Sequence, residues 1–243
     1  MKLLYIRHGQ STNNAGTSAG GHAPDSALTA LGHRQAHAIA HHLADAYGGQ
    51  VVAIYSSPFR RALQTATPIA AALGTPVQVA VPLHEMWGQY AYEPDGSVRQ
   101  HPGLSRTEML RIAPGAVLGD DVADEGWWFG SWPGVERAMA GMGDNAARFL
   151  DIVLTTHESA TPPADIVCAV GHGGSGDALV KRIAQGAHTF ATWFELDNTS
   201  LSQMRWHCTP EGERRIVIDY LNRVGLAARD PFDCPMVSEY RRV

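Results

Sequence analysis

The chain has 243 residues, of which 44% are hydrophobic and 18% are charged. This composition is that of a globular protein and excludes a wholly disordered chain, and the length suits one large domain, with or without an insertion, at about 150 residues per domain. Acidic residues outnumber basic ones by 24 to 19 and no Lys/Arg tract stands out, so we expect neither a nucleic-acid nor a membrane-surface partner.

Four short apolar runs predict buried strands. Continuous apolar runs, rather than alternating ones, are typical of strands that are covered on both faces of a mostly parallel sheet. The runs are Leu3–Ile6, Val51–Tyr55, Val77–Val81 and Ile166–Val170.

Helical patterns lie between the first three runs. Leu28–Tyr47 has its apolar residues on one helical face, and Thr29 is its predicted N-cap. The next helix is expected to open with Ser57 as N-cap and Pro58 as first helical residue, and to close at Gly74. Alternation of strand and helix predicts an α/β fold, which we expect to be a three-layer α/β/α arrangement.

Residues 86–134 interrupt the alternation. They hold eight glycines and no long periodic run, so we interpret them as a cap-like insertion of a single domain spanning 1–243, with a short helix near Ser105–Ile112. A longer helix is predicted over Val135–Leu154. Leu201–Trp206 and Arg214–Leu221 are candidates for further strands.

The cysteines and the N-terminus bear on the compartment. Cys168, Cys208 and Cys234 are odd in number and have no CxxC spacing, which is typical of reduced thiols in a cytosolic protein. The apolar run at Leu3–Ile6 is shorter than the roughly 7 residues of a signal peptide or about 20 of a membrane helix. We therefore expect a cytoplasmic protein.

Polar residues follow the predicted strands at their carboxyl ends, where α/β sheets bind ligands. Arginine binds phosphate oxygens bidentately, histidine can act as a nucleophile, and a carboxylic acid can protonate a leaving group. The residues at the four strand ends are Arg7, His8, Arg61, Glu85 and His172. Together they suit phosphoryl transfer through a phosphohistidine.

The run of Arg7, His8 and Gly9 resembles the signature of the histidine phosphatase superfamily, which is also called phosphoglycerate mutase-like. Four further segments resemble the family's motifs, in the family's order. They are Leu28–Ala36 (L-T-x-x-G-x-x-Q-A), Ser57–Ala66 (S-x-x-x-R-A-x-x-T-A), Leu83–Glu85 (L-x-E) and His172–Gly174, which matches the second histidine.

The resemblance implies a role for each matching residue. His8 is implied to be the nucleophile that becomes phosphorylated, and Glu85 the general acid and later the base. The phosphoryl oxygens are implied to be bound by a set of donors: Arg7, Asn14, Arg61, His172 and Gly173. The family's spacing selects Arg61 rather than its neighbour Arg60, because Arg61 directly precedes Ala62. No cofactor and no metal is implied.

The leading hypothesis is a phosphatase that acts on a small phosphomonoester. Phosphoglycerate mutases of this fold carry an R-R-S-Y-type run after the acidic residue, and Met86–Tyr90 lacks it, so hydrolysis is favoured over a phosphomutase. A non-catalytic phosphate-ligand binding protein is a lower alternative. A metal-dependent hydrolase is disfavoured because Arg7 and Arg61 would repel a divalent cation.

Some residues leave two interpretations open. The histidines at 33, 37 and 41 follow a helical spacing, and we favour a solvated helix flank over a metal stripe. Three tryptophans of the insertion either pack on the core or stack on a substrate: Trp127, Trp128 and Trp132. Arg106 is a weak candidate for contacting the leaving group. The expected partner is a small phosphorylated substrate, and a homodimer is possible.

Overall fold

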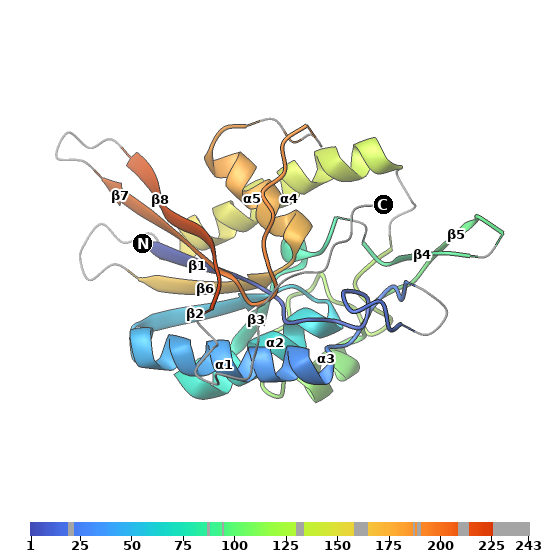
Figure 1. Cartoon of the computed structure of the whole chain (residues 1–243), viewed down its shortest axis with the longest axis horizontal. Helices are drawn as coiled ribbons and strands as arrows, with labels where there is room; N and C mark the ends of the chain where they lie inside the picture. The colour runs from blue at the N-terminus through green and yellow to red at the C-terminus, as the bar shows by residue number, and fades with distance from the viewer. Residues whose placement is uncertain are drawn as a thin grey trace.

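A six-stranded sheet lies between two layers of helices in the computed structural model (Figure 1). The structure describes residues 1–18, 22–86, 88–93, 95–129, 134–157, 165–186, 188, 191–208 and 214–225. The strand order is β3 (Val77–Val79), β2 (Val51–Ser56), β6 (Ile166–Gly171), β1 (Lys2–Arg7), β7 (Leu201–Cys208) and β8 (Arg214–Arg223). The first four are parallel, and β7 and β8 are each antiparallel to the strand before them in this order. The predicted α/β/α fold with a mostly parallel sheet is thereby confirmed.

The helices cover both faces of the sheet. Helices α1 (Ala30–Tyr47) and α2 (Arg60–Leu73) lie on one face, and α4 (Val135–His157) and α5 (Gly173–Ile183) lie on the other (Figure 1). Alternate residues of β1 serve the two layers. Leu4 and Ile6 pack with the α1 and α2 side chains, whereas Leu3 and Tyr5 pack with those of α4 and α5. This double burial explains why the strand is apolar throughout.

Several element bounds differ from the sequence prediction. Helix α2 begins at Arg60 with Phe59 as its N-cap, so the predicted start at Ser57 was wrong. The third strand ends at Val79, and a 3₁₀ turn over Val81–Leu83 follows, in which Pro82 suits the first turn of a helix. Thr29 caps α1 as predicted, because its side chain accepts a hydrogen bond from the Gly32 N–H.

Two other helices agree with the prediction in position. Helix α4 runs on to His157, beyond the predicted end at Leu154. The short helix α3 (Arg106–Ile112) has Ser105 as its N-cap in a capping box with Glu108. None of the helices in the described ranges is long and apolar enough to span a membrane. Cys168 is a free, fully buried thiol, whereas the side chains of Cys208 and Cys234 lie outside the described part of the chain.

The insertion packs on the core beside α2. It contains a two-stranded antiparallel sheet, β4 (Tyr90–Tyr92) and β5 (Val98–Gln100), which the sequence prediction missed. Buried side chains of the insertion join the α1–α2 core cluster, among them Leu104, Met109 and Trp127. These side chains therefore pack on the face of the sheet that α1 and α2 cover, whereas β4 and β5 extend away from it (Figure 1).

Helix α1 holds the loop that follows β1 by close backbone contact. A Cβ atom on Gly32 would lie 2.0 Å from the Gln10 carbonyl oxygen, and one on Gly9 would lie 2.5 Å from the Gly32 carbonyl oxygen. The Gln35 side chain accepts a hydrogen bond of 2.8 Å from the Gln10 N–H. The loop after His8 is thus fixed against the first turns of α1.

We expect Gly32→Ala to destabilise the protein by about 1–3 kcal/mol, because a methyl group there meets backbone that cannot move aside. Urea unfolding followed by circular dichroism would measure this. Gly141→Ala is the matched control, since a Cβ atom in the middle of α4 meets nothing within 4 Å, and it should stabilise the helix by about 1 kcal/mol. Equal stability of the two variants would contradict the close contact.

Candidate active site

The candidate site lies at the carboxyl ends of the parallel strands. His8 follows β1 directly and is 2% exposed. Its backbone N–H donates to the Gly171 carbonyl at the end of β6, at 2.9 Å. Its carbonyl accepts from the Asn198 side-chain amide, also at 2.9 Å. Both sides of the His8 backbone are therefore held by elements distant in sequence.

The hydrogen bonds of the His8 ring determine where its lone pair lies. Nδ1 is 2.7 Å from the Gly9 carbonyl oxygen, which can only accept, so Nδ1 carries the proton. Nε2 accepts a hydrogen bond of 3.1 Å from Nε of Arg61. A neutral imidazole with its lone pair on Nε2 is the form that can act as a nucleophile.

Helix α2 positions Arg61 through its N-terminus. The Asp25 carboxylate accepts a hydrogen bond of 2.9 Å from the Arg60 backbone N–H and so caps the helix from a distant loop. The Phe59 ring lies 4.4 Å from the Arg61 guanidinium carbon and 4.9 Å from the His172 ring. Arg61 is 7% exposed and faces His8, whereas the Arg60 side chain is 36% exposed and lies near Asp25.

Arg7 is the last residue of β1 and directly precedes His8. One of its Nη atoms donates to the Leu196 carbonyl oxygen. Gly173 lies against its guanidinium, because a Cβ atom there would be 3.9 Å from both Cζ and Nε of Arg7. Among the described residues, Nε of Arg7 and Nη1 of Arg61 are buried donors without a hydrogen-bond partner. Buried donors of this kind are suited to binding an anion.

His172 joins the site from the end of β6. Its ring centroid is 5.0 Å from that of His8, and its Nε2 is 2.7 Å from Oγ of Ser57. The Tyr5 hydroxyl donates to the His172 carbonyl oxygen and accepts from its N–H, both at 2.8 Å. His172 is thus fixed at the entrance of α5, with the helix N-terminus turned toward the same anion site.

Glu85 approaches from the segment after the 3₁₀ turn. Its Oε1 accepts hydrogen bonds from the N–H groups of Met86, at 2.8 Å, and Gly174, at 3.0 Å. A Cβ atom on Gly174 would lie 2.2 Å from this oxygen, so the carboxylate can approach α5 only because this residue is glycine. With Oε1 anchored, the second oxygen is presented in a fixed direction.

The site is cationic and buried. Burial, and then the charges of Arg61 and Arg7, hold the pKa of His8 well below its usual value. The pKa of His172 is lowered by the same causes and by His8 and His84. Burial also lowers the pKa of Arg61. Both imidazoles are therefore neutral at neutral pH, which keeps His8 nucleophilic in a positive field that attracts an anion.

We expect Arg61→Gln to move the acidic limb of the pH profile of kcat/KM to higher pH. Protonation of His8 removes its lone pair, and loss of a nearby positive charge raises the pKa at which this happens. We also expect kcat/KM at neutral pH to fall by about 10²–10³-fold, the typical cost of losing a donor to a developing charge. A variant that lowers the profile without moving its acidic limb would show that Arg61 does not influence the protonation of His8.

Other predicted residues lie farther from the ring of His8. The Asn14 side-chain oxygen accepts from the Ser11 N–H and hydroxyl, at 3.1 and 3.0 Å, and from the Asn198 amide at 3.2 Å. The Asn14 oxygen thus closes the turn that begins at Ser11, and its side-chain NH₂ group would have to supply the predicted hydrogen bond to a phosphoryl oxygen. The Arg106 guanidinium donates to carbonyls of Gly119 and Val122 within the insertion, and its weakly favoured contact with a leaving group stays a prediction.

The structure bears on the two interpretations left open for the tryptophans of the insertion and for the histidines of α1. Trp127 is 5% exposed in the core and packs on Phe59, with ring centroids 5.3 Å apart. Trp128 is half-buried, and Trp132 lies outside the described residues. The side chains at positions 33, 37 and 41 are exposed, as a solvated flank requires. Within the described ranges, no group of three or more His, Cys, Asp or Glu side chains could hold a metal ion.

Sequence reasoning missed the residues that hold the site in place. Thr65 accepts a hydrogen bond of 3.0 Å from the Gly9 N–H, and its position one turn after Arg61 in the quoted motif was the available signal. Three further contacts join residues that are distant in the sequence: Ser57 with His172, Asn198 with the His8 carbonyl, and Asp25 with the backbone N–H of Arg60. Phe59 packs on Arg61, two residues away, and on His172. Each of these residues holds in place a site residue, or the helix that carries one, that the sequence did predict.

Comparison with known proteins agrees with this geometry. Residues 3–111 match the sequence model of the histidine phosphatase superfamily (branch 1). A glucosyl-3-phosphoglycerate phosphatase of Mycolicibacterium vanbaalenii is 30% identical over 221 residues, which are 87% of each chain. The PE-PGRS family protein PE_PGRS11 of Mycobacterium tuberculosis is 42% identical over 82 residues, and the match spans 34% of this chain but 14% of that protein.

A solved structure extends the likeness to the fold. The structure of a mycobacterial glucosyl-3-phosphoglycerate phosphatase in complex with VO₃ superposes with a TM-score of 0.58. The two sequences are 25% identical, and the match covers 92% of this chain and 99% of the other. The likeness therefore extends over most of both chains.

Proposed function

The chain belongs to the histidine phosphatase superfamily, and from that premise we propose that it hydrolyses a small organic phosphomonoester through a phosphohistidine on His8. One observation carries the proposal. Nε2 of His8 holds a lone pair and lies 3.1 Å from Nε of Arg61, and further donors of Arg61 and Arg7 are buried without a hydrogen-bond partner. A nucleophile and the donors for a phosphoryl group therefore meet at one point.

In the first step, Nε2 of His8 attacks phosphorus and the bond from phosphorus to the ester oxygen breaks. The Arg61 N–H that is hydrogen-bonded to Nε2 turns to a phosphoryl oxygen, and Arg7 binds another. Glu85, in its protonated form, gives its proton to the departing oxygen, so the leaving group departs as an alcohol. Nδ1 of His8 keeps its proton throughout and donates it in a hydrogen bond to the Gly9 carbonyl oxygen.

In the second step, a water molecule attacks the phosphorus of phospho-His8. Glu85, now a carboxylate, takes a proton from this water, and the bond from phosphorus to Nε2 breaks. The products are inorganic phosphate and the starting form of the enzyme. Anchoring of Oε1 by the N–H groups of Met86 and Gly174 keeps the carboxyl group in one place for both steps.

The substrate class follows from the relatives and remains part of the proposal. Because the 30%-identical relative is a glucosyl-3-phosphoglycerate phosphatase, we propose phosphate esters of hydroxy acids and their glycosides as the first compounds to assay. Simple esters such as methyl phosphate and glycerol 3-phosphate complete the panel. A phosphomutase would instead transfer phosphate between hydroxyl groups of the acid and release little to water.

The test is release of inorganic phosphate from this panel with EDTA present, together with quenching of the enzyme during turnover of a labelled ester. We expect phosphate release that survives the chelator. We also expect a labelled enzyme that loses its phosphate in acid but keeps it in alkali, with the label on the peptide containing His8. An acid-stable label, or activity lost with the chelator, would reject the proposed mechanism.

A further inference from the structure

Two donors hold the backbone of Glu85, the proposed acid. Its carbonyl oxygen accepts hydrogen bonds from Nδ1 of His84, at 2.7 Å, and from the Gly88 N–H, at 2.8 Å. The His84 side chain thus turns back onto the residue that follows it, and it is buried at 6% exposure. Because Oε1 of Glu85 is bound to the Gly174 N–H at the start of α5, both the carboxylate and the main chain of the acid are fixed.

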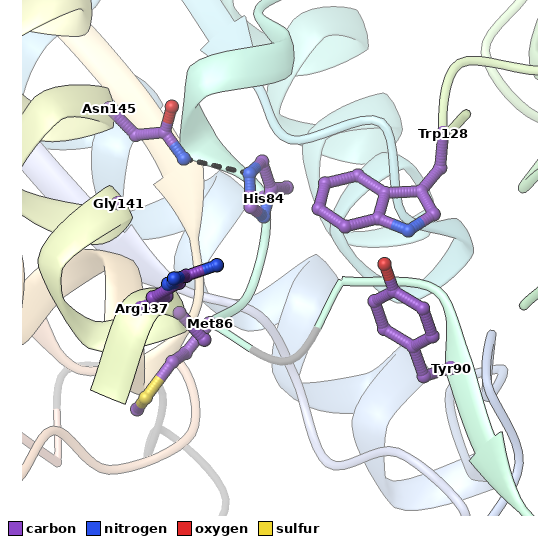
Figure 2. A pocket seen from close by; sticks show the side chains of 8 residues that line it. His84, Met86, Tyr90, Trp128, Arg137, Gly141 and Asn145 are labelled. Carbon is purple, nitrogen blue, oxygen red and sulfur yellow. Dashed lines mark hydrogen bonds between the residues drawn. The ribbon is translucent and has the colours of Figure 1, made fainter. Parts of the chain in front are cut away.

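Helix α4 holds the other edge of the His84 ring. Nδ2 of Asn145 lies 2.7 Å from Nε2 of His84. Figure 2 shows the Asn145 side chain pointing from α4 to this ring, with Trp128 on the ring's other side. The ring centroids of Trp128 and Trp127 lie 4.9 and 5.8 Å from that of His84. The ring therefore lies between α4 and the insertion, and two hydrogen bonds in series connect Asn145 to the backbone of Glu85.

The two hydrogen bonds of the His84 ring determine its charge. A carbonyl oxygen can only accept, so Nδ1 carries a proton. Nε2 faces an amide NH₂ group, which donates, so Nε2 holds a lone pair. These assignments describe a neutral imidazole, and burial lowers the pKa of His84 in the same sense. Asn145 favours this neutral form, because its NH₂ group would face a second N–H if the ring were charged.

The charge of His84 matters to the ionisable groups around it. Arg137 of α4 and Tyr90 of β4 line the pocket of Figure 2 together with the ring. His172 lies close enough for a charge on His84 to lower its pKa. A positive charge on His84 would also favour the carboxylate form of its neighbour Glu85. Because the first step of the proposed reaction needs Glu85 in its protonated form, an imidazolium at this position would oppose that step.

We infer that His84 and Asn145 are positioning residues for Glu85: Asn145 holds the His84 ring neutral and in place, and His84 in turn fixes the backbone of the acid. Neither residue touches the substrate, and both act through Glu85. The inference rests on the proposed function, because it is the proton transfer by Glu85 that needs this alignment. The acid is then held between two helices, with its carboxylate bound to α5 and its main chain connected to α4.

Three variants test the alignment. His84→Phe keeps a ring but loses both hydrogen bonds, whereas His84→Asn keeps an N–H donor near the place of Nδ1. Asn145→Ala releases the ring from α4. Circular dichroism and thermal unfolding verify that each variant is folded. If His84 acts through its hydrogen bond to Glu85, the asparagine should restore what the phenylalanine loses.

The measurement is the rate of phosphoenzyme formation from two esters by rapid quench. Glycerol 3-phosphate needs a proton on its leaving alcohol, whereas p-nitrophenyl phosphate does not. We expect His84→Phe to slow the glycerol ester about 10–100-fold and the nitrophenyl ester less than about threefold. Asn145→Ala should slow the glycerol ester about 3–10-fold, and His84→Asn should stay within about threefold of the wild type on both esters. A general loss of structure would slow both esters alike, and that result, or no loss in His84→Phe, would overturn the inference.

Asn145→Asp tests the neutral state of the ring. A carboxylate accepts from an Nε2–H and so stabilises the imidazolium, which favours the charged form of Glu85. We expect the basic limb of the pH profile of kcat/KM for glycerol 3-phosphate to move to lower pH by about one unit. Ala140→Asp is the matched control, because it adds the same charge to an exposed position of α4, and it should follow the wild-type profile. An Asn145→Asp profile whose basic limb coincides with that of the control would overturn the inference.

Glu85→Gln separates the inference from the proposed function. Equal slowing of the two esters by Glu85→Gln would overturn both. If Glu85→Gln spares the nitrophenyl ester but His84→Phe slows both esters alike, only the positioning role is overturned. Residues that act through Glu85 should also have nothing left to act on in its absence, so adding His84→Phe to Glu85→Gln should slow the glycerol ester less than about threefold further. A full additional loss in the double variant would show that His84 acts elsewhere and would overturn the inference.

Discussion

Replacing His8 with alanine is expected to lower kcat by about 10⁵-fold, because loss of a covalent nucleophile costs an enzyme most of its rate enhancement. The variant keeps Arg7, Arg61 and the N-terminus of α5, so it should still bind inorganic phosphate. Steady-state assays with the ester that the wild type hydrolyses fastest, and calorimetric titration with phosphate, would measure the two properties. The labelled phosphoenzyme should be absent.

The matched control for this variant is His33→Ala. His33 is an exposed histidine of α1, and its loss should change kcat less than about twofold. A His8→Ala enzyme that retains a tenth of the wild-type kcat would overturn the covalent mechanism. The direct attack of water, with the arginines as the sole catalysts, would then be the better account.

The parallel strands could be predicted from the sequence because their burial on both faces makes them apolar throughout, and such a run is visible in the local composition. Leu3–Ile6 and Ile166–Val170 are covered on both faces, so their apolar runs identify them without any knowledge of the partner strands. The bounds of α2 were less predictable. Ser57 has the side chain of an N-cap, and its hydroxyl accepts a hydrogen bond of 3.3 Å from the Phe59 N–H, but it also contacts Nε2 of His172, and the helix begins three residues later at Arg60. The local pattern predicts the first of these contacts and not the second.

The candidate site also has a part that the sequence predicts and a part that it does not. His8 and His172 follow strands that the sequence locates, so their meeting follows from the rule that parallel strands align their carboxyl ends. The contacts that orient them do not follow from any local pattern. Asp25 caps α2 across 35 residues, and Asn198 reaches the His8 carbonyl across 190. Such pairs depend on how whole elements pack, and no periodic pattern in the sequence predicts them.

The loss of rate on removal of the proton donor should depend on how much the leaving group needs a proton. We expect Glu85→Gln to lower kcat for an alkyl ester such as glycerol 3-phosphate by about 10²–10⁴-fold, the usual contribution of a general acid. For p-nitrophenyl phosphate, whose leaving group is stable as an anion, the loss in the formation of the phosphoenzyme should be much smaller. Rapid-quench measurement of the first step with both esters would show the difference, and equal losses would mean that Glu85 does not donate the proton.

Gly174→Ala should reproduce this pattern without altering Glu85. The added methyl group would lie 2.2 Å from Oε1, so the carboxylate must leave the Gly174 N–H and lose its alignment with the departing oxygen. Gly173→Ala is the matched control, because the atoms nearest to its Cβ lie 3.9 Å away, on Arg7. If the position of Glu85 is what matters, Gly174→Ala should slow the alkyl ester far more than the nitrophenyl ester, and Gly173→Ala should slow both alike and modestly. The comparison isolates the geometry of the acid from its chemistry, since both variants keep every ionisable group of the site.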